Sequence, residues 1–71
     1  MELVQAFLAG AMRPCAPDEA DALARLLEDA LARAREAWPG LQLDAADFAR
    51  HLGERVAPEL PLADGLRSLS A

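Results

Sequence analysis

The stretch AWPGLQLDAADFARHL, residues 37–52, contains the end of one helix and the start of another. Pro39 and Gly40 stop the preceding helix, because proline has no amide proton to donate and glycine is a poor helix former. Asp44 is then spaced as the N-cap of a new helix, with Asp47 at its third position. We therefore expect two helices that turn back on each other in an αα-hairpin corner. Bulky apolar side chains should fill this corner: Trp38, Leu41, Leu43 and Phe48.

The segment before the corner predicts the clearest helix of the chain, over about residues 18–38. It opens with a proline and acidic residues, which suit the positive end of a helix dipole, and carries Arg33 and Arg35 toward its end. On one face, acidic and basic residues alternate every four positions, which is typical of a solvated surface: Asp21, Arg25, Asp29 and Arg33. The apolar stripe that we expect to be buried comprises Ala20, Leu23, Leu27, Ala30, Leu31, Ala34 and Trp38.

Apolar spacing predicts three further helices, over about residues 2–12, 45–57 and 62–69. Pro14 and Pro17 break the chain after the first of them, because each biases the residue before it away from the helical conformation. Alanine and leucine dominate the composition and β-branched residues are nearly missing, which excludes a sheet.

The sequence thus predicts an all-α fold, a small bundle of three helices plus a short C-terminal fourth helix, in a single domain over residues 1–71. The predicted core comprises Leu3, Phe7, Leu8, Leu23, Leu27, Leu31, Trp38, Phe48, Leu52 and Val56.

The first predicted helix has a wide apolar stripe and a thin polar face, so large side chains stay exposed unless a neighbour covers them. Two interpretations fit this pattern. In one, the stripe packs against the second helix as part of the core. In the other, it binds a partner protein, and replacing Phe7 and Leu8 by serine weakens that contact. The candidate partner-binding residues of this second interpretation are Leu3, Val4, Phe7, Leu8 and Met12.

Charge and cysteine content exclude several classes of partner. The formal net charge is −5, and the twelve acidic residues are spread along the chain, whereas nucleic-acid binding needs a concentrated basic face. Cys15 is the only cysteine, so no internal disulfide forms and a reducing compartment fits best. No apolar run is long enough to span a bilayer. We expect a cytoplasmic segment that contacts neither nucleic acid nor membrane directly.

No group of residues predicts catalysis or metal binding. His51 has no second histidine or cysteine at ligand spacing, and Cys15 has no histidine nearby. Glu28 and Asp29 are adjacent on a helix and therefore point about 100° apart, so they cannot share a substrate. We expect no catalytic, cofactor-binding or metal-binding residues, no cofactor, and a protein that is not an enzyme.

The stretches AREAWPGLQLDAADFARHLGERV and LADGLRSLSA resemble the N-terminal region of a myxobacterial family of RNA polymerase sigma factors of the extracytoplasmic-function-like type. In that family an Ala/Leu-rich helix ends in Ala-Trp-Pro-Gly, and a helix with a Phe-x-x-His-Leu pattern follows it. A Leu-rich segment then leads into the first polymerase-binding region. The matching residues lie within about residues 20–71 and are Trp38, Pro39, Gly40, Phe48, His51, Leu52 and Leu66.

The resemblance implies a bacterial protein-interaction region that is accessory or regulatory in transcription initiation. The DNA-reading and polymerase-binding regions of that family follow this segment, so none of their residues is carried over. The implied partners are the remainder of its own chain, RNA polymerase, an anti-sigma protein or a second copy. The chain ends in RSLSA with no glycine or proline stop, so we expect an N-terminal fragment of a longer chain.

Two other functions stay open. A free-standing helical docking or adaptor module, which mediates protein-protein association, would account for the acidic charge and the amphipathic helices equally well. A helix-turn-helix DNA binder would use residues 45–57 and 62–69, joined by APELP. Its reading helix would offer only Arg67 against Asp64, which is too little positive charge to hold phosphates.

Overall fold

Four α-helices account for most of residues 2–69, the part of the chain that the computed structural model describes. They are α1 (Glu2–Ala11), α2 (Pro17–Ala37), α3 (Ala45–Arg55) and α4 (Leu62–Leu69). No strand occurs in these residues, which confirms the predicted all-α fold of three helices and a short fourth. The helix α3 ends two residues earlier than predicted, because Val56 already has an extended backbone ahead of Pro58.

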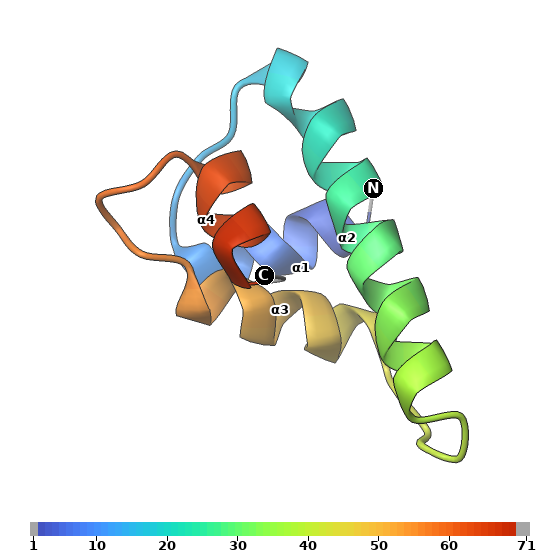
Figure 1. Cartoon of the computed structure of the whole chain (residues 1–71). Helices are drawn as coiled ribbons and strands as arrows, with labels where there is room; N and C mark the ends of the chain where they lie inside the picture. The colour runs from blue at the N-terminus through green and yellow to red at the C-terminus, as the bar shows by residue number, and fades with distance from the viewer. Residues whose placement is uncertain (1, 70–71) are drawn as a thin grey trace.

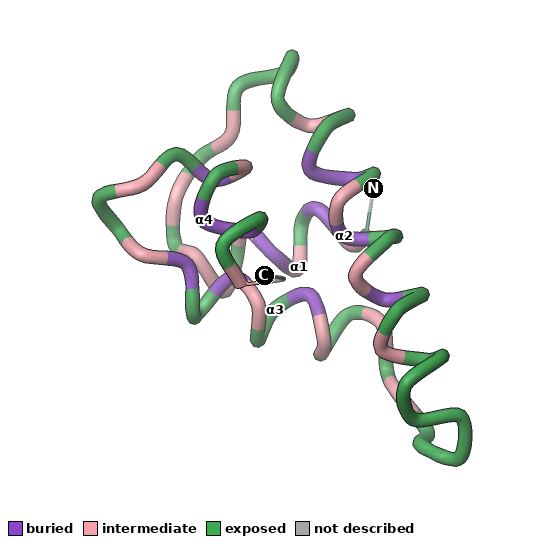
Figure 2. The backbone as a smooth tube through the Cα atoms, in the orientation of Figure 1, coloured by how far each residue is buried: buried purple, intermediate pink, exposed green. Residues whose placement is uncertain are grey.

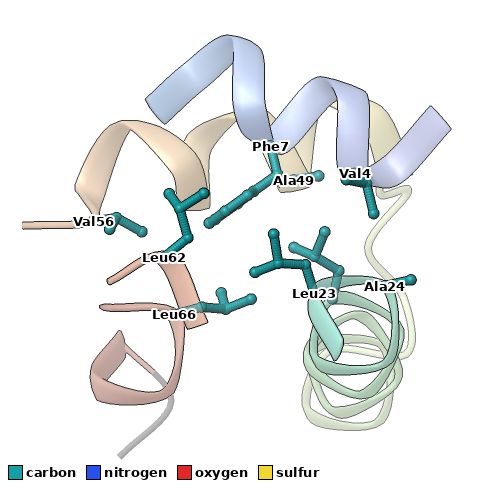
Figure 3. Close-up of a cluster of buried hydrophobic side chains, with 9 residues drawn as sticks. Val4, Phe7, Leu23, Ala24, Ala49, Val56, Leu62 and Leu66 are labelled. Carbon is teal, nitrogen blue, oxygen red and sulfur yellow. The ribbon is translucent and has the colours of Figure 1, made fainter. Parts of the chain in front are cut away.

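The helices form two layers around one core. The helices α1 and α3 lie side by side and run in the same direction, and α2 and α4 lie across the core from them (Figures 1 and 3). The longest helix, α2, has 21 residues, whereas α3 has 11. The C-terminal half of α2 and the turn after it therefore project beyond the other helices (Figure 1).

The helices α1 and α3 approach closely because each presents a glycine to the other. A Cβ atom built on Gly53 of α3 would overlap the Phe7 carbonyl oxygen and lie 2.8 Å from the Ala11 amide nitrogen. A Cβ atom built on Gly10 of α1 would overlap the Arg50 carbonyl oxygen. In both cases the neighbour is backbone, so no flexible side chain can move aside to make room.

The core lies between the two layers, and its largest fully buried side chains are Phe7, Leu23, Leu27 and Leu66. Every buried residue that the structure describes is either apolar or glycine, so hydrophobic burial is the main stabilising term. The continuous cluster, most of which Figure 3 labels, comprises Val4, Phe7, Leu23, Ala24, Leu27, Ala49, Val56, Leu62 and Leu66.

The prediction of the core is confirmed for Phe7, Leu23, Leu27, Leu31 and Val56, all of which are buried. Four other predicted core residues are only half-buried: Leu3, Leu8, Phe48 and Leu52.

The prediction for Trp38 is wrong, because its side chain is 62% exposed. Leu41, expected in the same corner, is 56% exposed. The physical reason is that α2 is longer than the helices beside it, so its last turn has little to pack against (Figure 2).

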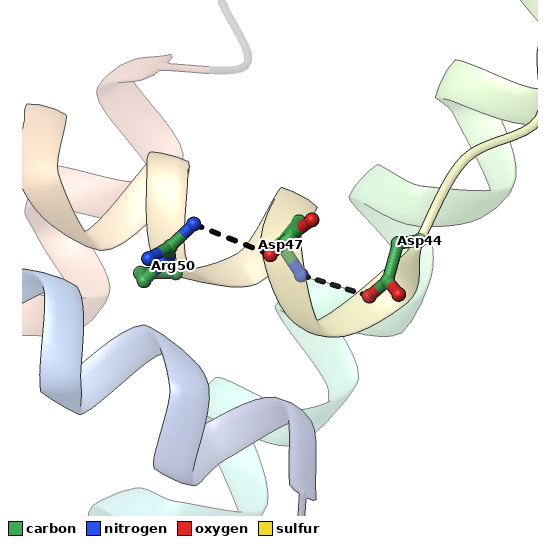
Figure 4. Close-up of polar contacts among 3 residues, drawn as sticks. All are labelled: Asp44, Asp47 and Arg50. Carbon is green, nitrogen blue, oxygen red and sulfur yellow. Dashed lines mark hydrogen bonds and ion pairs between the residues drawn. The ribbon is translucent and has the colours of Figure 1, made fainter.

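The start of α3 follows the predicted capping pattern. The Asp47 amide donates a hydrogen bond to Asp44 Oδ1 at 3.1 Å, and the Phe48 amide donates to the Asp44 carbonyl oxygen at 3.0 Å. The Arg50 guanidinium then donates to Asp47 Oδ1 at 3.2 Å (Figure 4). An aspartate N-cap of this kind typically contributes about 1 kcal/mol, and here it fixes where Phe48 and the rest of α3 begin.

The end of α1 has an unusual backbone conformation at Met12, whose φ is 57°. The Met12 amide donates to the Leu8 carbonyl oxygen at 2.8 Å, which closes the last turn in the left-handed geometry that glycine adopts most easily. The Met12 side chain is 87% exposed, so its removal loses no packing.

We expect Met12→Gly to raise the free energy of unfolding by about 0.5–1 kcal/mol, because glycine relieves the penalty that a Cβ atom incurs at positive φ. Urea denaturation followed by circular dichroism measures this difference. Met12→Ala is the control, since it keeps the Cβ atom and should leave stability nearly unchanged. Equal stability of the glycine and alanine variants would contradict the expectation.

Candidate functional site

An apolar groove of about 360 Å³ lies between the C-terminal half of α2, the helix α3 and the end of α4. We call it the Trp38 groove. Its lining comprises Ala30, Arg33, Ala34, Ala37, Trp38, Phe48, Leu52 and Leu69.

The groove exists because the apolar face of α2 changes from large to small residues along the helix. Leucines at 23, 27 and 31 fill the space beneath the first part of α2. Ala30, which lies between the last two of these leucines, and Ala34 and Ala37 beyond them line the groove, and their single methyl groups leave the space toward α3 open. Phe48 and Leu52 form the opposite wall of the groove. The Asp44 cap fixes the first residue of α3 and therefore which residues of that helix lie at this position.

Trp38 gives the groove an exposed aromatic edge. Its ring lines the groove, yet the side chain is 62% exposed, and Leu41 beside it is 56% exposed. Both residues lie where α2 ends and the following turn begins, the exposed part of the chain that projects beyond the other helices (Figures 1 and 2). Small soluble proteins rarely leave such residues clustered and uncovered unless something binds there.

The charges at the groove are nearly balanced. Arg33 is the only charged residue in its lining, and its guanidinium donates to Asp29 Oδ2 at 2.6 Å. Both side chains are largely exposed, so this ion pair contributes little to stability. An apolar ligand in the groove therefore meets no unpaired charge in the described lining. Asp29 and Arg33 belong to the row of alternating charges predicted on α2, and the structure shows that these two side chains form an ion pair.

The partner-binding residues predicted from the sequence do not gather at this groove. Val4 and Phe7 are core residues, with Phe7 fully buried, so the interpretation of the α1 stripe as a partner surface is wrong for these two. They face the core because the Gly10 and Gly53 contact brings α1 onto α3. Leu3 and Leu8 are half-buried against the core, and Met12 is exposed but lies outside the groove lining.

The residues weighed for chemistry stay apart in the structure. Within residues 2–69, no three histidine, cysteine or acidic side chains form a group that could hold a metal ion. His51 is exposed on α3, and Cys15 is half-buried in the connector between α1 and α2. No helix in the same range combines the length and the apolar character needed to cross a membrane.

The pKa of the Cys15 thiol is raised, first by burial and then by the negative charges of Glu19 and Asp18 at the start of α2. A raised pKa leaves less of the reactive thiolate at any pH below it. We expect alkylation of Cys15 by iodoacetamide at pH 8 to be slower than that of an unhindered cysteine peptide. Glu19→Gln should speed it, because that change removes one of the causes. An equal rate for the peptide and the folded chain would contradict this.

Comparison of the chain with known protein families, with curated proteins and with solved structures finds no match. The resemblance to sigma factors therefore stays a prediction from the sequence.

Proposed function

We propose that this chain is a protein-interaction module and that the Trp38 groove binds a helix of a partner protein. The observation that supports this proposal is the exposed Trp38 ring at the edge of an apolar groove. Tryptophan is among the residues most enriched at the energetic centres of protein interfaces, because it buries a large rigid surface. The chain acts by binding, with no catalytic step of its own.

The partner segment is an amphipathic helix with an apolar face and basic flanks. The alanine wall of α2 allows a helix to approach closely, and Phe48 and Leu52 offer contacts for large apolar side chains spaced three or four residues apart. Arg33 is neutralised by Asp29, so the inserted face is uncharged. Over the whole sequence, twelve acidic residues against seven basic ones favour a partner with positive charge beside its apolar face.

The setting that we propose is bacterial transcription initiation, in the cytoplasm. The resemblance around Trp38, Pro39 and Gly40 makes this chain similar to the N-terminal region of a sigma factor. In this setting the module is accessory or regulatory and reads no DNA. Core RNA polymerase is the partner to test first. The alternative is a free-standing adaptor module that uses the same groove for another protein.

The test is a fluorescence anisotropy titration of purified bacterial core RNA polymerase into the chain labelled at its amino terminus. We expect saturable binding that Trp38→Ala weakens by at least about tenfold, since loss of a central tryptophan commonly has an effect of this size. Gly40→Ala is the matched control, because a Cβ atom on Gly40 has no neighbour within 4 Å. Circular dichroism should show both variants folded, because both residues are exposed.

Each outcome decides a separate part of the proposal. Binding that Trp38→Ala leaves unchanged would exclude the groove as the polymerase contact. Absence of binding would remove the polymerase as the partner and with it the proposed setting. A melting temperature that rises with chain concentration would then support the adaptor alternative, with a second copy as its partner.

A further inference from the structure

Arg13 joins two connectors that are far apart in the sequence. It lies between α1 and α2, and its Nη1 atom donates to the Leu60 carbonyl oxygen at 2.8 Å and to the Pro58 carbonyl oxygen at 3.3 Å. Both acceptors belong to the loop between α3 and α4. The Arg13 Nη2 atom is buried and has no hydrogen-bond partner among the described residues. The half-buried guanidinium is thus fixed between the two connectors by its hydrogen bonds.

The polar contacts within α4 are local by comparison. Arg67 pairs with Asp64 at 3.4 Å, and the Ser68 hydroxyl donates to the Gly65 carbonyl oxygen at 2.8 Å. A helix of eight residues is not stable in isolation, so α4 depends on what anchors it. Its apolar anchors are Leu62 and Leu66 in the core.

The position of α4 determines the shape of one end of the Trp38 groove. Leu69, the last residue of α4, is part of the groove lining, and Leu62 starts the same helix directly after the loop that Arg13 holds. A rigid helix transmits a displacement of its start to its end. We propose that Arg13 is a positioning residue for the groove: it fixes the loop before α4 and thereby sets where Leu69 lies.

The chemistry of the contact explains why arginine serves here. The guanidinium offers several donors in a fixed plane, so one side chain satisfies two carbonyl oxygens at once. A lysine ammonium reaches a single carbonyl oxygen with less defined geometry. Methionine keeps an apolar stem of similar length but leaves both carbonyl oxygens without their donor. These two substitutions therefore separate the hydrogen bonds from the packing of the stem.

Amide hydrogen exchange by NMR on the free chain tests this inference without any partner. In Arg13→Met we expect exchange in residues 62–69 to rise by at least about tenfold, which corresponds to the loss of a charge-assisted hydrogen bond. Protection of α1 and α3 should stay as it is. Nuclear Overhauser contacts between the Leu69 methyl groups and the core residues against which they pack should disappear. Arg13→Lys should give an intermediate result on both measures.

The control is Arg67→Met, which removes an arginine of the same charge from α4 itself and should leave the Leu69 contacts in place. An equal rise of exchange in all four helices would show that Arg13 only supports overall stability and would overturn the inference. Retained Leu69 contacts in Arg13→Met would overturn it as well. Should Arg13→Met fail to fold, Arg13→Lys carries the same two tests.

The importance of this role for binding rests on the proposed function of the groove. If polymerase binding is lost in Trp38→Ala but kept in Arg13→Met, the proposed function stands and the role of Arg13 in binding is rejected. If polymerase does not bind at all while exchange in α4 rises as expected, Arg13 positions the groove and the proposed partner is rejected.

Discussion

Gly53→Ala is expected to lower the free energy of unfolding by about 2–3 kcal/mol, because the added methyl group is forced against the backbone of α1. A Cβ atom at this position would overlap the Phe7 carbonyl oxygen. Intrinsic helix propensity predicts the opposite sign, a gain of about 1 kcal/mol for alanine over glycine inside a helix. The sign of the change therefore separates close helix packing from local propensity.

Urea denaturation of Gly53→Ala and of the matched variant Gly40→Ala measures this effect. A methyl group added at Gly40 would have no neighbour within 4 Å, so this replacement should be neutral or slightly stabilising. We also expect Gly10→Ala to destabilise, because its methyl group would overlap the Arg50 carbonyl oxygen. Gly53→Ala that is more stable than the parent chain would contradict the close contact between α1 and α3.

Phe7→Ala is expected to have the largest effect, a loss of about 3–5 kcal/mol of folding free energy. Phe7 is fully buried and contributes the only aromatic ring of the described core. A domain of this size typically has a total stability of about 4–10 kcal/mol, so the variant should be largely unfolded near its working temperature. Thermal denaturation followed by circular dichroism measures the loss.

Met12→Ala is the control on the same helix, since its side chain is 87% exposed, and it should melt within a few degrees of the parent chain. A Phe7→Ala variant that stayed fully folded would contradict the assignment of Phe7 to the core. It would also reopen the interpretation of the α1 stripe as a partner-binding surface.

The helices were predictable because residues that typically start or stop a helix lie at their ends. Pro17 starts α2, Pro39 and Gly40 follow its end, and Asp44 caps α3 as its spacing predicts. These are local effects, which depend on the backbone chemistry of a few neighbouring residues. Local chemistry is what a single sequence shows most directly.

The exposure of Trp38 was not predictable in the same way. Helical periodicity tells which face of α2 is apolar, but it does not tell how far the neighbouring helices extend along that face. The residues at the end of the α2 stripe face α3 across a groove and are not packed into a core. The signal available in the sequence was the change from leucines at 23, 27 and 31 to alanines at 30, 34 and 37.

The role of the glycines was also hidden from the sequence. Inside a helix, glycine lowers the helix propensity, and this property says nothing about whether Gly10 and Gly53 lie at a contact between helices. Their function appears only when α1 and α3 are placed side by side, with backbone against backbone. The same contact decides that Phe7 faces the core, which the α1 stripe alone left open.

Hydrogen exchange of the chain with and without core RNA polymerase, followed by mass spectrometry, tests the proposed binding surface most directly. We predict that polymerase slows exchange in residues 30–38, at the end of α2, and in residues 48–52 of α3, the two segments that supply most of the groove lining. The amides of α1, on the far side of the core from α2, should keep the exchange rates of the free chain. Slowed exchange confined to α1, or exchange unchanged throughout the chain, would contradict the Trp38 groove as the docking surface.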